Sequence, residues 1–155
     1  MPKVPPALQP VFLEFTEGPT FVARAIAGIE AGLLNRPGRE GWSVRDVLVH
    51  LCDAELVGAL RFRMVLAEER PNLPVYEPDV WKKRLHYLWR SPEAALSLFQ
   101  QMRFGTAELL AQCAMADWDR VGLHPARGEM NVGDLLQLYA SHALEHAAQI
   151  EALRS

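Results

Sequence analysis

Two histidines near the C-terminus, His142 and His146, lie four residues apart in the stretch SHALEHAAQI. Four residues make about one turn of an α-helix, so both imidazoles would lie on one side of a helix. Two imidazoles placed in this way can bind one metal ion. Glu145 is rotated by about 100° from His146 around the helix axis, so it does not match the general base of an HExxH metalloprotease. The pair therefore indicates a metal site of another kind.

A third ligand is available from His50, in the stretch VRDVLVHLCDAE. His50 adjoins the apolar row of the helix predicted there, and a buried imidazole without a partner would cost about 1–3 kcal/mol. Cys52 lies about 200° further around the same helix and points elsewhere. We expect His50, His142 and His146 to bind one divalent transition metal. The alternative is that each histidine is a core side chain bonded to backbone or water.

Three further side chains are weaker candidates for the site. Arg103, on the apolar face of the third predicted helix, could bind a carboxylate of a thiol cofactor. Glu55 could orient a ligand or act as a general base. The alternative for Arg103 is a side chain that extends its charged end to solvent or pairs with Glu55. The alternative for Glu55, which lies near the inward row of its helix, is that same ion pair. His124, in the stretch GLHPARG, is expected in a loop, where it is either exposed or part of a pocket.

The periodicity of apolar residues predicts four helices that would carry these side chains. They are expected at 19–35, 43–69, 91–114 and 131–153. Ser43, Ser91 and Asn131 are the expected N-caps of the last three, and Pro19 suits the first turn of the first helix. A short helix is expected at 11–15, ended by Glu-Gly-Pro. Helices of these lengths favour an all-α fold, a four-helix bundle.

Two connections of this bundle are longer than usual. The segment 70–90 should contain a short helix after Pro78, and 115–131 should form a loop or a small hairpin. We expect both to cover one end of the bundle or to line a cleft. The side chains expected to pack the first connection onto the bundle, or else to line that cleft, are Trp81, His86, Tyr87 and Trp89.

The composition excludes several classes of function. The chain has 155 residues, half of them apolar, which suffices for a single domain, expected over 1–155. A formal charge of −3 without blocks of like charge argues against nucleic-acid binding. No apolar run approaches the length of about 18 residues needed to span a membrane, and no cationic, apolar leader opens the chain. We therefore expect a cytoplasmic protein. Cys52 and Cys113 are expected to be small buried hydrophobic residues.

Several motifs, taken in order, resemble the DinB/YfiT-like superfamily, in its DinB-like branch. They are GWSVRDVLVHLCDAE, RFRM, FQQMRFG, W..VG.HP..GEMNVGDLL and HALEHAAQI, where each dot stands for one residue of any type. The resemblance extends over about 8–153. It implies a four-helix bundle with a long crossover connection, a homodimer in many members, and a divalent metal, nickel or zinc above all, on three histidines. By their place in the motifs these histidines are His50, His142 and His146.

The same resemblance implies a function. Members of the superfamily include S-transferases that use bacillithiol, mycothiol or glutathione, and mycothiol-dependent maleylpyruvate isomerases. A divalent ion on three neutral histidines deprotonates a coordinated thiol, which is what S-transfer requires. We therefore expect a metal-dependent S-transferase whose partners are a small-molecule thiol and an electrophile. The alternatives are a metal-dependent hydrolase of a small molecule and a non-catalytic bundle with a structural metal.

Overall fold

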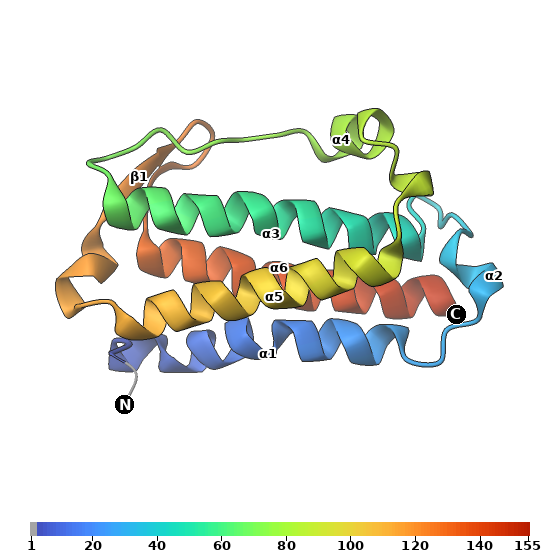
Figure 1. Ribbon diagram of the computed structural model, residues 1–155, viewed down its shortest axis with the longest axis horizontal. Helices are drawn as coiled ribbons and strands as arrows, with labels where there is room; N and C mark the ends of the chain where they lie inside the picture. Colours follow the sequence, from blue (N-terminus) through green and yellow to red (C-terminus); the bar gives the residue numbers. More distant parts are fainter. Residues whose placement is uncertain (1–2) are drawn as a thin grey trace.

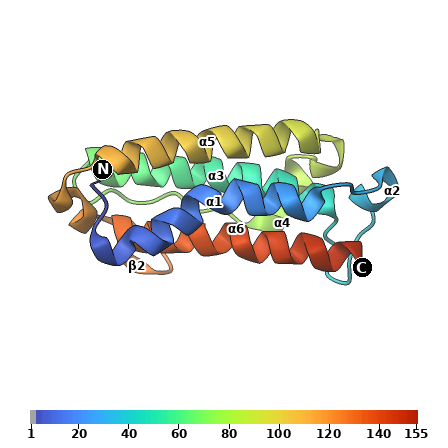
Figure 2. The same cartoon turned by 90° about the horizontal axis from the view of Figure 1, so that it is seen from below.

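Four long helices form the body of the protein in a computed structural model that describes residues 3–155 (Figure 1). They are α1 (Gln9–Ile26), α3 (Val44–Ala67), α5 (Pro92–Gln112) and α6 (Val132–Arg154). Helices α1 and α3 each pack against both α5 and α6, so they occupy opposite corners of the bundle. Figure 2 shows α1 between α5 and α6, on the side away from α3. The predicted all-α four-helix bundle is confirmed.

The helices α3 and α5 run in the same direction, opposite to α1 and α6 (Figure 1). The chain must therefore return along the whole bundle between α3 and α5, and it does so in a long crossover over residues 68–91. The crossover contains α4 (Pro78–Arg84), which is the predicted helix after Pro78, and a 3₁₀ turn at Tyr87–Trp89. The long crossover is thus confirmed.

The second long connection, 115–131, contains a hairpin, which is one of the two structures predicted for it; the other was an irregular loop. Strands β1 (Val121–His124) and β2 (Gly128–Asn131) pair antiparallel. The backbone of Leu123 also bonds to the start of the crossover: its oxygen accepts from the Leu73 N–H at 2.9 Å, and its N–H donates to Pro71 at 2.8 Å. The hairpin therefore fastens the crossover at one end of the bundle. The remaining short elements are 3₁₀ turns at Pro6–Leu8 and Met115–Asp119, and α2 (Ala31–Leu34).

Side-chain caps define the starts of the helices that bear the histidines. In α3 the Ser43 hydroxyl accepts from the Asp46 N–H at 3.2 Å, and Asp46 accepts from the Ser43 N–H at 2.9 Å. In α6 Asn131 and Asp134 form the same reciprocal pair, at 2.8 and 2.9 Å. Each pair satisfies two N–H groups that a helix start otherwise leaves unpaired. The predicted caps, including Ser91 of α5, are confirmed.

The first helix differs from the prediction of 19–35. Helix α1 begins earlier and continues through Pro19, and it ends just before Gly28, whose φ of 66° is left-handed. Pro19 has no N–H, so the Phe15 carbonyl one turn earlier loses its helical partner. Arg103 replaces that partner, because its Nη1 donates to the Phe15 oxygen at 2.9 Å. A contact distant in sequence thus allows the proline inside the helix.

The crossover aromatics follow the prediction only in part. Tyr87 is buried and Trp81 is half-buried, so these two pack onto the bundle. Trp89 is 82% exposed and His86 is also exposed, so neither packs onto the bundle. Both instead line a surface pocket beside α4, in keeping with the alternative role predicted for them. His86 has a left-handed φ of 52°, which reverses the chain before the 3₁₀ turn, and only Tyr87 of that turn faces inward. Within residues 3–155, no helix is both long and apolar enough to cross a membrane.

The glycine before Pro19 gives a test of this packing. A Cβ on Gly18 would lie 2.8 Å from Arg103 Nη1 and 3.0 Å from the Cβ of Ala143, whereas one on Gly105 would meet nothing within 4 Å. Because Arg103 is held by hydrogen bonds, we expect Gly18→Ala to lower the free energy of unfolding by about 1–3 kcal/mol. Gly105→Ala should raise it by up to about 1 kcal/mol through helix propensity. Urea unfolding measures both, and equal effects would contradict the packing described.

Candidate metal centre

The three predicted ligands converge between α3 and α6. His50 projects from α3, and His142 and His146 project from α6. The Nε2 atom of His142 lies 3.1 Å from Nε2 of His50 and 3.0 Å from Nε2 of His146. One ligand nitrogen from each residue lies within 4.8 Å of the other two. The structure thus brings together residues that are 92 positions apart in the sequence.

The hydrogen bonds of the three rings fit a bound metal ion. His146 Nδ1 lies 2.7 Å from Gln149 Oε1, an acceptor, so Nδ1 carries the proton and Nε2 has a free lone pair. Nε2 of His142 faces two ring nitrogens but has only one proton or one lone pair to offer them. One divalent ion would satisfy all three nitrogens together.

Burial keeps these imidazoles neutral. Burial, followed by electrostatic repulsion from neighbouring His146 and His50, lowers the pKa of His142 to about 2. The pKa of His50 is lowered to about 4 by burial and, secondarily, by His146. The pKa of His146 is also lowered, mainly by burial. Neutral imidazole is the form that binds metals, so the centre is ready to bind an ion at neutral pH.

Aromatic side chains cover one side of the centre. The ring of Trp42 meets the His50 ring edge-on, with centroids 5.5 Å apart, and Tyr76 of the crossover approaches His50 with centroids 6.3 Å apart. His142 and His146 are only half-buried, so part of each residue reaches solvent. Three protein ligands with an open side are typical of catalytic metal sites, whereas structural sites are closed by four.

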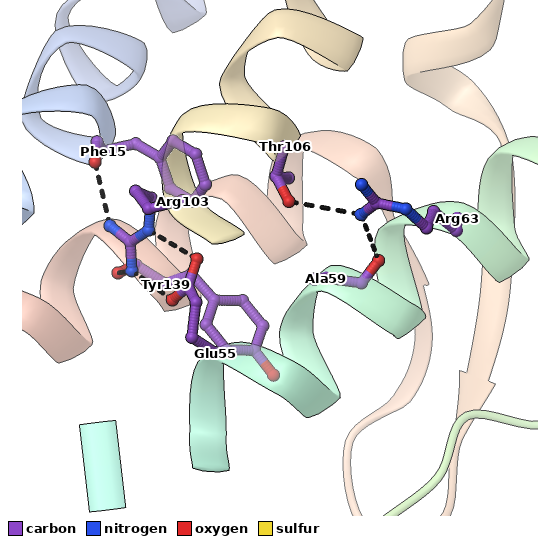
Figure 3. Close-up of polar contacts among 7 residues, drawn as sticks. All are labelled: Phe15, Glu55, Ala59, Arg63, Arg103, Thr106 and Tyr139. Carbon is purple, nitrogen blue, oxygen red and sulfur yellow. Dashed lines mark hydrogen bonds and ion pairs between the residues drawn. The ribbon is translucent and has the colours of Figure 1, made fainter. Parts of the chain in front are cut away.

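The side chains of Arg103 and Glu55 form a buried ion pair (Figure 3). Arg103 Nε and Nη2 donate to the two carboxylate oxygens of Glu55, both at 2.7 Å. The guanidinium also donates to the backbone oxygens of Phe15, at 2.9 Å, and of Tyr139, at 3.1 Å. These contacts use four of its five N–H groups. The ion pair, which was the alternative for both residues, is the arrangement observed.

The candidate roles of these residues in the site are accordingly corrected. Arg103 has one N–H left and is 1% exposed, so it is not placed to bind the carboxylate of a thiol cofactor. Both oxygens of Glu55 are engaged, so it is not a free general base. His124 lies in β1, and its Nδ1 accepts from the N–H groups of Ala126 and Arg127, both at 3.1 Å. That imidazole shapes the turn of the hairpin.

Some residues around the centre were not predicted from the sequence. Gln149 fixes the tautomer of His146, and its position three residues later on the same helix was the available signal. Trp42 and Tyr76 lie in connections, where apolar periodicity gives no information. Cys52 is buried as predicted; burial raises the pKa of its thiol, and it is not among the grouped ligands.

The fold and the centre together define a class of protein. It is a four-helix bundle with a long crossover and with three histidines, arranged as metal ligands, between two antiparallel helices. The sequence profile of the DinB superfamily matches residues 20–150, and the chain belongs to that superfamily. The predicted membership is confirmed.

Relatives and a solved structure agree with this assignment. Proteins of Bacillus licheniformis and Bacillus mycoides, both provisionally named metal-dependent hydrolases, are each 29% identical to this chain. Both alignments cover 91% of this chain, and 81% and 82% of the respective relatives. The solved structure of YfiT from Bacillus subtilis is described as "a probable metal-dependent hydrolase with an unusual four-helix bundle topology". It matches 97% of this chain and 87% of its own with a TM-score of 0.89 and 25% identity.

The lowered histidine pKa values predict a pH dependence of the metal-stripped protein. Unfolding returns each pKa to about 6.5, so the unfolded chain binds more protons as the pH falls below that value. The free energy of unfolding should therefore be highest above pH ~7 and fall as the pH drops from ~6.5 through ~4, the pKa of folded His50. Urea unfolding across this range measures the effect. His142→Gln should show a smaller decrease, and an equal decrease in both proteins would contradict the buried, neutral histidines.

The ion pair predicts a distinct stability pattern. Arg103→Met leaves the Glu55 carboxylate buried without a counter-charge and should lower the free energy of unfolding by about 3–5 kcal/mol. Adding Glu55→Leu should restore much of this loss, because the uncompensated charge is then gone. Arg63→Met is the control: Arg63 is exposed, and within the described part of the chain its side chain bonds only to Ala59 and Thr106 (Figure 3), so its loss should cost less than about 1 kcal/mol. A double variant less stable than Arg103→Met would refute this account.

Proposed function

We propose that this protein is a metal-dependent S-transferase that joins a low-molecular-weight thiol, of the bacillithiol or mycothiol class, to a small electrophile. The observation that carries the proposal is the convergence of His50, His142 and His146 beside an open side of the bundle. When bound there, a divalent ion such as nickel or zinc keeps its full charge on three neutral ligands and lowers the pKa of a coordinated thiol or water.

The residues of the chain prepare this chemistry in two ways. Gln149 holds the proton of His146 on Nδ1, so that Nε2 is free to coordinate. Trp42 and Tyr76 cover His50 and exclude water from one side of the centre. Reduced access to water strengthens the electrostatic effect of a bound ion on a nearby thiol.

Transfer of a thiol fits the surroundings better than attack by water. The two buried carboxylates that follow His50 on α3 are engaged: Glu55 with Arg103, and Asp53 with the Tyr87 hydroxyl and with Arg90. Glu145, next to His146 on α6, is exposed and acts on that imidazole from the solvent side, where its charge opposes the lowering of the pKa by burial. Among residues 3–155, no carboxylate or thiol joins the three-histidine group. A thiol is far more acidic than water, so on coordination to a metal ion it would release its proton to solvent without a general base. Because neither buried carboxylate is free to act as a base, the interior side of the centre favours the thiol as nucleophile.

Hydrolysis of a small molecule is the second candidate. The Bacillus relatives and YfiT, which match this chain over most of its length, carry names that describe metal-dependent hydrolases. The same three histidines would serve this reaction, with water as the nucleophile.

The test uses protein purified without a histidine tag and loaded with nickel or zinc. We expect about one ion per chain by elemental analysis, and metal-dependent conjugation of cysteine or bacillithiol to an aryl halide. His142→Ala should lose both the ion and the conjugation, because it removes the central ligand. His86→Asn is the control: it removes an exposed histidine outside the centre, and asparagine tolerates the left-handed backbone there. It should retain both properties.

Two results would contradict the proposal. Cleavage of an aryl ester without thiol, together with no conjugation, would favour the hydrolase. A bound ion with neither activity, together with a steep loss of thermal stability in His142→Ala, would favour a structural metal.

A further inference from the structure

Arg61 is a buried cation without a counter-ion. It lies in α3 with 6% of its surface exposed, and within residues 3–155 no carboxylate lies within ion-pair distance of it. Its neighbours differ in this respect, since buried Arg103 pairs with Glu55 and half-buried Arg90 pairs with Asp53. A buried charge without a partner is strongly disfavoured, so the site of Arg61 favours an anion.

The guanidinium is held in place with donors to spare. Nε and Nη2 donate to the carbonyl of Pro74 in the crossover, at 3.0 and 2.6 Å. Nη1 donates to the Tyr139 hydroxyl at 3.1 Å. These bonds use three of its five N–H groups. Two remain for another acceptor, which is what bidentate binding of a carboxylate requires.

Tyr139 connects Arg61 to the metal centre. Its ring lies so close to α3 that a Cβ on Gly58 would come within 2.5 Å of it. Figure 3 shows the ring extending away from Arg103, which contacts only the backbone oxygen of Tyr139. The ring centroid is 6.4 Å from that of His142. The hydroxyl accepts from Arg61, so its own proton remains available to an anion.

Tyr76 adds a further donor to this group. Its hydroxyl forms no hydrogen bond with the residues described, and its ring faces His50 with centroids 6.3 Å apart. Burial raises the pKa values of both Tyr76 and Tyr139, so both hydroxyls keep their protons. Tyr76 is two residues after Pro74, whose carbonyl binds Arg61, and Arg61 in turn binds the Tyr139 hydroxyl, so the crossover brings the three side chains to the same part of the bundle. The three side chains therefore offer several donors and carry no negative charge, and the carboxylate that acts on Tyr76, Asp53, is already paired with Arg90.

We infer that Arg61, together with the hydroxyls of Tyr139 and Tyr76, binds the carboxylate of a small molecule whose other end reaches the three histidines. The identification of that other end as a thiol rests on the proposed function. A divalent ion and an uncompensated guanidinium also give this part of the protein a net positive charge. An anionic substrate neutralises that charge, whereas an uncharged substrate leaves it buried.

The experiment measures thiol binding to the cobalt-loaded protein by the thiolate-to-cobalt absorption band. The ligands are mercaptocarboxylates with one to five methylene groups, each compared with the mercaptoalcohol of the same length. We expect at least one carboxylate to bind about tenfold or more tightly than its alcohol, because a hydrogen bond to a charged group contributes that much. The preferred length then reports the distance from Arg61 to the ion.

The variants identify the residue responsible for the preference. Arg61→Met should abolish it while the alcohols bind as before, and Arg61→Lys should retain part of it. Tyr139→Phe should reduce it. The control is Arg63→Met, which removes an exposed arginine two residues away and should leave the preference intact. Equal binding of carboxylates and alcohols at every length, or a preference that survives in Arg61→Met, overturns the inference.

A separate result distinguishes failure of the proposed function from failure of the carboxylate site. If no thiol binds to the cobalt-loaded protein, the S-transferase proposal fails. Thiol-free carboxylates and alcohols of the same lengths are then compared by thermal unfolding. A carboxylate-specific rise in Tm that is lost in Arg61→Met supports the carboxylate site, and the absence of such a rise overturns it.

Discussion

A single guanidinium joins the four helices of the bundle. Arg103 projects from α5, pairs with Glu55 of α3, and donates to the backbone of Phe15 in α1 and of Tyr139 in α6. Without this guanidinium, Glu55 would lack a counter-charge, and the Phe15 oxygen, four residues before Pro19, would lack a donor. The contact therefore both stabilises the bundle and fixes the relative positions of its helices, because rotating or shifting any one helix leaves a buried polar atom without its partner.

The three-histidine centre depends on this contact although it shares no atom with it. The histidines come from α3 and α6, so their convergence requires a fixed register between those two helices. Glu55 is five residues after His50, and Tyr139 is three residues before His142, so Arg103 fixes both helices about one turn from their ligands. Tyr139 extends the network, since its backbone contacts Arg103 and its hydroxyl contacts Arg61. One residue thus connects the centre of the bundle with the crossover.

The features that were predictable from the sequence are those encoded by nearby residues. The caps at Ser43 and Asn131, and the placement of His142 and His146 on one side of a helix, depend on spacings of three or four residues. Features that depend on distant partners were not predictable in this way. Pro19 inside α1 is acceptable only because Arg103 binds the Phe15 carbonyl. The isolation of Arg61 is likewise visible only when every neighbouring charge has been located.

The crossover has a consequence for how proteins of this architecture can diversify. The ligands of the centre are on α3 and α6, inside the bundle, where the caps and the Arg103 contact fix them. The crossover supplies Tyr76 to the surroundings of the centre, but it supplies no ligand. Substitutions and changes of length in this segment can therefore alter which molecules are admitted without disturbing the ligands. The long return between two parallel helices separates, along one chain, the part that must be kept from the part that is free to evolve.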